Sequence, residues 1–142
     1  MPGLDQILRD LPMLLAATMV AILFLQSGLD KVTDWSGNLE WLTGHFSKTF
    51  LAGMVPMMLG TVTITEIATG LLSAVGIVYY LVSGSTVFIF WGGVIGAVSI
   101  LSLFFGQRVA KDYPGAAVLV PYFLLLLVLI ILGQPNRPAV TF

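Results

Sequence analysis

Long apolar runs alternate with short polar segments along most of the chain. The runs cover about residues 11–27, 53–82, 85–107 and 115–133, and a helix of roughly 20 mostly apolar residues is long enough to cross a bilayer. Only the segment SGST separates the second run from the third, and the compact segment RVAKDYPG separates the third from the fourth. Such short turns require antiparallel neighbours. The pattern therefore predicts an all-α membrane protein, a four-transmembrane-helix up-and-down bundle that forms a single domain over residues 1–142.

The polar connection between the first two runs predicts a further helix over about residues 37–50. Its apolar residues recur at helical spacing with polar residues between them, namely Trp35, Leu39, Leu42, Phe46 and Phe50. This pattern is typical of an amphipathic helix that lies in the membrane interface, where the ring of Trp41 also suits the headgroup level. We interpret His45, in the same segment, as an interfacial polar residue near water.

Composition supports a membrane protein and excludes several kinds of site. Hydrophobic residues make up 58% of the chain and charged residues 9%, whereas a soluble domain has roughly 25% charged residues. A net charge of −1 provides no field for nucleic acid, and membrane lipid is the expected partner. The chain has no cysteine and one histidine, which excludes thiolate metal sites, iron–sulfur clusters and two histidine ligands to a haem. We therefore expect no metal and no cofactor within the chain itself.

Glu66 is the only charged side chain between Leu51 and Gln107. The surrounding segment TVTITEIATG alternates like a β-strand, but an isolated strand in lipid would leave its backbone polar groups unpaired. A helix is therefore expected here. Small and polar residues then share the Glu66 face, namely Thr63, Thr69, Gly70 and Ser73, whereas Ile64, Ile67, Leu71 and Val75 lie opposite. The Glu66 face is predicted to turn into the bundle.

Up-and-down topology places most polar residues of the chain on one side of the membrane. This side carries Gln26, Asp30, Lys31, His45, Lys48, Gln107, Arg108, Lys111 and Asp112. Glu66 lies about ten residues inside the same face, roughly 15 Å deep at the helical rise. The termini and the uncharged SGST turn lie on the opposite side.

An ionised carboxylate alone in hydrocarbon is so costly that Glu66 must take up a proton or pair with a cation. Our hypothesis is that it faces Lys31 or Arg108, directly or through Gln26 or water, at the polar floor of a pocket. These four residues are the candidates for ligand binding or proton exchange. Two interpretations stay open: a carboxyl group satisfied within the bundle, or a group with a ligand or proton role.

The last two apolar runs differ in character. Small residues recur at intervals of three or four in the third run, namely Gly92, Gly96, Ser99, Ser102 and Gly106. They serve close helix packing or, alternatively, form a smooth wall for a planar ligand. The fourth run is rich in leucine and isoleucine and is expected to be the most lipid-exposed helix, with a kink at Pro121.

Basic residues predict the orientation of the bundle in the membrane. The face with the first and third loops carries Lys31, Lys48, Arg108 and Lys111, whereas Arg9 and Arg137 lie on the other side. The excess of positive charge favours the loop face as cytoplasmic. Both termini would then lie on the outer, periplasmic side of a bacterial inner membrane.

Three features together resemble the DoxX family of membrane proteins. They are FLQSGLDKV at the end of the first run, a glutamate within the second run, and GQRVAKDYPGAA after the third. The resemblance covers nearly the whole chain. Family members that the chain resembles include the membrane subunit of thiosulfate:quinone oxidoreductase. The resemblance implies an association with quinone and with other protein subunits of electron-transfer complexes.

Two classes of function follow. In the first, the chain is a quinone-associated subunit of a respiratory or sulfur-oxidising complex, in which Glu66 exchanges protons while Gln26, Lys31 or Arg108 hydrogen-bonds a quinone carbonyl. The electrons would come from a partner subunit. In the second, the chain is a non-catalytic accessory subunit without a small-molecule substrate, and its charged residues set topology and hold helices together. Whether the chain takes part in catalysis stays open between them.

Overall fold

A computed structural model describes residues 1–135, and this part of the chain contains helices and no β-strand. The elements in chain order are α1 (Leu4–Arg9), α2 (Leu11–Thr33), α3 (Trp35–His45), the 3-10 helix η1 (Ala52–Met54), α4 (Val55–Ser83), α5 (Val87–Val109) and α6 (Tyr113–Gly133). The TVTITEIATG segment lies inside α4. Its strand-like alternation is therefore overridden by the helix that a span in lipid requires.

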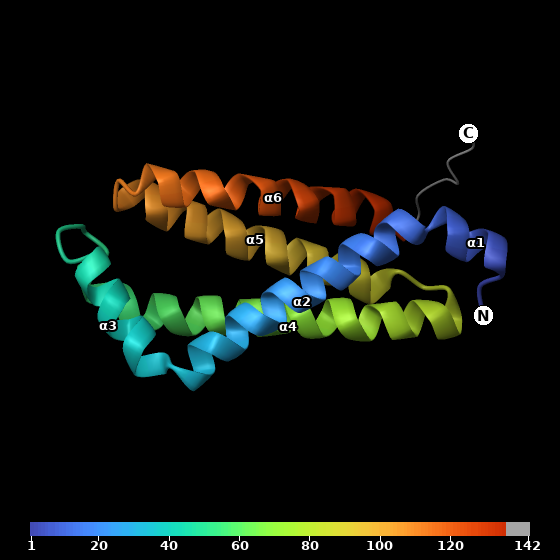
Figure 1. Cartoon of the computed structure of the whole chain (residues 1–142), viewed down its shortest axis with the longest axis horizontal. Helices are drawn as coiled ribbons and strands as arrows, with labels where there is room; N and C mark the ends of the chain where they lie inside the picture. Colours follow the sequence, from blue (N-terminus) through green and yellow to red (C-terminus); the bar gives the residue numbers. More distant parts are fainter. Residues whose placement is uncertain (136–142) are drawn as a thin grey trace.

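Four helices of the described residues are long and apolar enough to cross a membrane: α2, α4 together with η1, α5 and α6. In the bundle, α4 packs between α2 and α5, α5 packs on α6, and α2 also contacts α6. Figure 1 shows α4, α5 and α6 running side by side while α2 crosses them obliquely. This arrangement confirms the predicted all-α bundle of four transmembrane helices.

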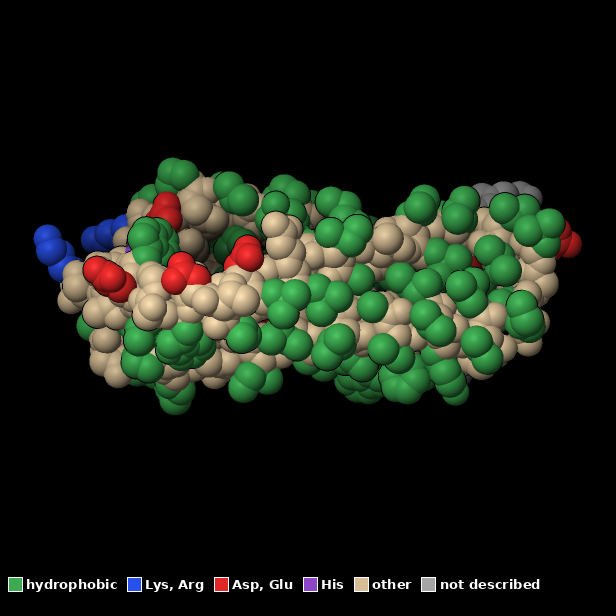
Figure 2. All heavy atoms as spheres, turned by 60° about the horizontal axis from the view of Figure 1, so that its bottom comes forward, with side chains coloured by type: hydrophobic (Ala, Val, Ile, Leu, Met, Phe, Trp, Pro, Cys, Tyr) green, Lys and Arg blue, Asp and Glu red, His purple; other side chains and the backbone are tan. Residues whose placement is uncertain are grey.

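The two ends of the bundle differ in what they carry. Figure 1 places α1 and the turn between α4 and α5 at one end, and α3 and the turn between α5 and α6 at the other. On the face seen in Figure 2, basic side chains lie only at the end that carries α3, acidic side chains lie toward both ends, and apolar side chains cover much of the length between them. The apolar middle is suited to contact with membrane lipid. Arg137 lies outside the described residues.

The structure differs from the prediction in the extent of two helices and in one additional helix, and the other helix boundaries agree within two residues. The first transmembrane helix continues to Thr33, six residues beyond the predicted end, because Lys31 keeps its side chain inside the bundle by bonding Ser27 and Glu66. The helix after it spans Trp35–His45 instead of about 37–50. A further short helix, α1, precedes α2.

Helix α3 ends early because the chain turns back on itself after His45. The amide groups of Ser47 and Thr49 donate to the carbonyl groups of Gly44 and Phe46, which lie three residues back. The hydroxyl groups of the same two residues also donate to those carbonyls. Side chains of serine and threonine that bond nearby backbone compete with a continuing helix in this way.

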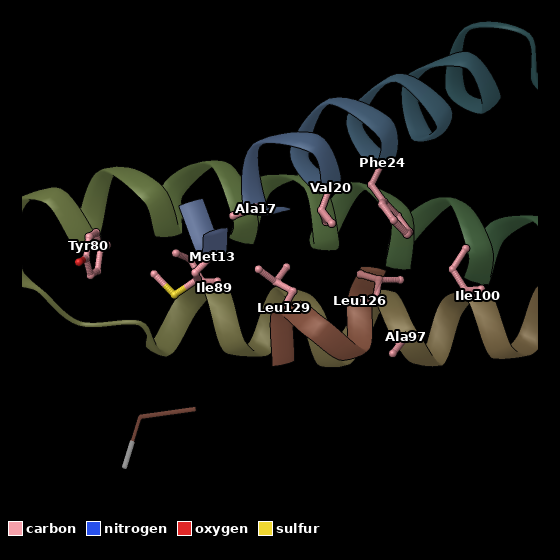
Figure 3. Packing of buried hydrophobic residues seen from close by; sticks show 10 residues of the cluster. All are labelled: Met13, Ala17, Val20, Phe24, Tyr80, Ile89, Ala97, Ile100, Leu126 and Leu129. Atoms are coloured by element: carbon pink, nitrogen blue, oxygen red, sulfur yellow. The ribbon is translucent and has the colours of Figure 1, made fainter. Parts of the chain in front are cut away.

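The main core lies where α2 crosses α6 and α5. Its buried residues are Met13, Ala17, Val20, Phe24, Tyr80, Ile89, Ala97, Ile100, Leu126 and Leu129 (Figure 3). Helix α6 contributes the fewest buried positions, since 17% of its most apolar stretch is buried, against 33–39% in the other three spans. It is thus the most outward-facing helix, as its composition predicts, and it continues through Pro121 to Gly133.

Close contacts at glycine residues set how near the helices approach α4. A Cβ atom added to Gly92 would lie 2.9 Å from Ser73 Oγ, and one added to Gly96 would lie 2.8 Å from Thr69 Cγ2. Both neighbours belong to the Glu66 face of α4. The small-residue stripe of α5 therefore serves helix packing at these positions.

Candidate functional site

Lys31 and Glu66 form an ion pair between α2 and α4. Lys31 Nζ lies 3.0 Å from Glu66 Oε2 and 3.3 Å from Glu66 Oε1, and it also donates to Ser27 Oγ at 2.9 Å. Only 3% of Glu66 is exposed. The predicted pairing of the buried carboxylate with a cation is present, and Lys31 is the cation.

Two glycine residues bring α2 and α4 close enough for this pair. A Cβ atom at Gly28 would lie 2.6 Å from Ile67 Cγ1, and one at Gly70 would lie 2.6 Å from Leu25 Cγ. Because Gly28 precedes Lys31 by three residues, both lie on the same face of α2. The close backbone approach at Gly28 therefore places the Lys31 side chain over Glu66, one residue before Ile67.

The pair lies near the end of α2. This helix ends at Thr33, and the neighbouring Asp30 is exposed, which is costly within hydrocarbon. Helix α4 has 29 residues, about 43 Å at the helical rise, and so exceeds a hydrocarbon core of about 30 Å. Glu66 is the twelfth residue of α4, and its contact with Lys31 places it beside the last turn of α2.

The other two predicted candidates do not join the pair. Gln26 is exposed and has no side-chain hydrogen bond within residues 1–135. The Arg108 guanidinium lies 4.5 Å from the centre of the Tyr113 ring, an arrangement typical of a cation–π contact. Among the described residues, no group of three histidine, aspartate or glutamate side chains could hold a metal ion.

A groove of about 610 Å³ lies between the first turns of α4 and the last turns of α5. Helix α4 contributes Met57, Met58, Leu59, Thr61 and Val62, and α5 contributes residues 101–103 and 105–107. Leu42 of α3, together with Phe46 and Leu51 from the following segment, completes the wall. The walls are almost wholly apolar, so the groove suits a hydrophobic molecule from the membrane.

Glu66 does not form the floor of this groove, since it is not among the lining residues and its carboxylate bonds Lys31 of α2 instead. Val62, one turn before Glu66, lines the groove instead. The polar side chains of the lining are Thr61, Ser102 and Gln107. The sequence pattern predicted a pocket opening on this side, whereas the structure separates the groove from the ion pair.

Gln107 is joined to a polar cluster at the end of the groove. His45 Nε2 lies 2.7 Å from Gln107 Oε1 and 3.8 Å from Asp112 Oδ2. The imidazole ring stacks on Trp41, with ring centres 4.5 Å apart and planes inclined by 17°. Asp112 is itself held at the start of α6, where its Oδ1 accepts a hydrogen bond from the Gly115 amide at 3.0 Å.

None of the residues predicted for the site belongs to this cluster. His45, Gln107 and Asp112 share one side of the predicted bundle, which is the only sequence signal that brings them together. Their mutual contact depends on where α3 ends, and the helical pattern did not predict that boundary.

Comparison with known proteins gives no match to this chain among models of protein families, curated proteins or solved structures. The resemblance to DoxX proteins therefore stays a prediction.

Proposed function

We propose that the chain is a DoxX-like integral membrane subunit that binds a quinone in the groove between α4 and α5. The observation that carries this proposal is an apolar groove of about 610 Å³ with the Gln107 amide in its lining. A quinone has an apolar tail and ring, and its carbonyl oxygens accept hydrogen bonds. The groove offers both a hydrophobic wall and one amide group at its polar end.

Electron transfer in this proposal involves a second subunit. The chain has no cysteine and a single histidine, so the electrons would reach the quinone from a partner protein of a respiratory or sulfur-oxidising complex. This chain would bind and orient the quinone within the membrane. Its setting would be a bacterial inner membrane, with the α3 end facing the cytoplasm and both termini on the periplasmic side.

A second candidate function is favoured by a different observation. Lys31 and Glu66 satisfy each other and lie outside the groove, as expected of a pair that only joins two helices. On this alternative, the chain is a non-catalytic accessory subunit whose groove holds ordinary lipid.

Analysis of bound small molecules distinguishes the two functions. The protein would be extracted from its native membrane with a polymer that keeps the surrounding lipid, and quinone and phospholipid would be quantified per chain by mass spectrometry. The first function predicts about one quinone per chain, well above the ratio in the bulk membrane. A quinone content equal to that of the bulk membrane would support the accessory subunit.

A further inference from the structure

The arrangement around Gln107 leads to a more specific inference, which rests on the proposed function. We propose that the Gln107 side-chain amide determines the specificity of the groove by donating a hydrogen bond to a carbonyl oxygen of the ligand. His45 is then a positioning residue, which acts on the ligand only through Gln107.

The direction of the hydrogen bond between the two side chains carries the first step. The contact joins His45 Nε2 to Gln107 Oε1 at 2.7 Å, and an amide oxygen can only accept. His45 must therefore carry a hydrogen on Nε2. With its oxygen occupied, Gln107 retains the two N–H donors of Nε2, which have no hydrogen-bond partner within residues 1–135.

The surroundings of His45 favour the same direction. Asp112 Oδ2 lies 3.8 Å from His45 Nε2, and a nearby carboxylate favours a hydrogen on the nitrogen that faces it. The Gly115 amide holds Asp112 in place through its other oxygen, and Trp41 holds the imidazole plane by stacking. Contacts from the start of α6 and from α3 thus fix the orientation of a side chain on α5.

This orientation defines the ligand class. The groove presents a donor beside an apolar wall, so it should favour an apolar molecule that carries a carbonyl acceptor at one end over the same molecule without one. An unpaired donor facing an apolar ligand is costly, and a single hydrogen bond of this kind corresponds to about a tenfold preference.

The test compares two ligands and two substitutions of His45. Binding of a decyl-substituted benzoquinone and of decylbenzene would be measured by titration calorimetry on the full chain in lipid nanodiscs. His45→Phe keeps a flat ring to stack on Trp41 but removes the donor, whereas His45→Gln keeps an N–H donor. We expect His45→Phe to weaken quinone binding about tenfold and leave decylbenzene binding unchanged, and His45→Gln to restore most of the preference.

A second pair of variants keeps the inference testable if α3 is disturbed. Gln107→Leu should abolish the preference for the quinone, and adding His45→Phe to Gln107→Leu should cause no further loss, because His45 acts through Gln107. A wild-type preference that survives His45→Phe or Gln107→Leu would overturn the inference but leave the proposed function intact. A wild-type protein that binds both ligands equally would overturn the proposed function as well.

Discussion

The Lys31 ammonium and the Glu66 carboxylate, 3.0 Å apart, join the last turn of α2 to the middle of α4. The carboxylate is buried, and the lysine side chain keeps 19% of its surface exposed. Ser27 gives the ammonium a second acceptor within α2. The pair therefore satisfies a buried charge and fixes the crossing of the first two transmembrane helices.

Removing one member of this pair should destabilise the bundle. Glu66→Leu leaves a partly buried ammonium without its counter-ion, and we expect it to lower the free energy of unfolding by about 3 kcal/mol, at the low end for broken buried pairs because Lys31 is partly exposed. Glu66→Gln should cost less, since its amide oxygen still accepts from Lys31. Reversible unfolding in mixed detergent micelles measures both.

Combining the substitutions provides the control. The double variant Lys31→Met with Glu66→Leu removes both charges and should lie within about 1 kcal/mol of the wild type, because apolar residues can replace a buried pair. If the double variant instead loses as much stability as Lys31→Met alone and Glu66→Leu alone added together, the two side chains do not interact energetically.

The ion pair was predictable because its causes are local. Glu66 shares a helical face with Thr63 and Ser73, all three are buried, and a lone carboxylate on that face must take up a proton or pair with a cation. The choice of Lys31 over Arg108 was not predictable. It depends on the close approach at Gly28, and on Arg108 contacting Tyr113 instead.

The groove could not be predicted for a different reason. Its wall depends on α3 ending at His45, after which Phe46 and Leu51 fold against α4 and α5. Helical periodicity alone extended this helix to residue 50. The position of Gln107 in the groove is therefore a tertiary result, although its side of the membrane was evident.

The close crossing of α2 and α4 should not tolerate a methyl group. A Cβ atom at Gly70 would lie 2.6 Å from Leu25 Cγ and 2.9 Å from the Leu25 amide nitrogen, so one backbone must shift. We expect Gly70→Ala to lower the free energy of unfolding by about 1–3 kcal/mol. Gly44→Ala is the matched control, because nothing lies within 4 Å of its added Cβ atom and alanine favours the helix. Equal stability of the two variants would contradict the packing seen at Gly70.

Membrane orientation can be tested with single cysteine residues, since the chain has none. Lys31 is neutralised by Glu66, so the predicted orientation, with the α3 end in the cytoplasm, depends on Lys48, Arg108 and Lys111. An impermeant maleimide should label Gly3→Cys in intact spheroplasts and Lys48→Cys only in inverted vesicles. The reverse pattern would contradict the orientation, and labelling of both from one side would contradict the bundle topology.

The proposal of a quinone site in the groove is tested most directly by filling the groove. Ser102 lines it and is exposed on α5, whereas Val98, one turn away, is also exposed but does not line it. Ser102→Trp and Val98→Trp would be extracted in native lipid, and the quinone bound per chain would be measured beside the wild type. We expect Ser102→Trp to lose at least nine-tenths of the bound quinone and Val98→Trp to keep the wild-type amount. Equal quinone in all three proteins would contradict a site in this groove.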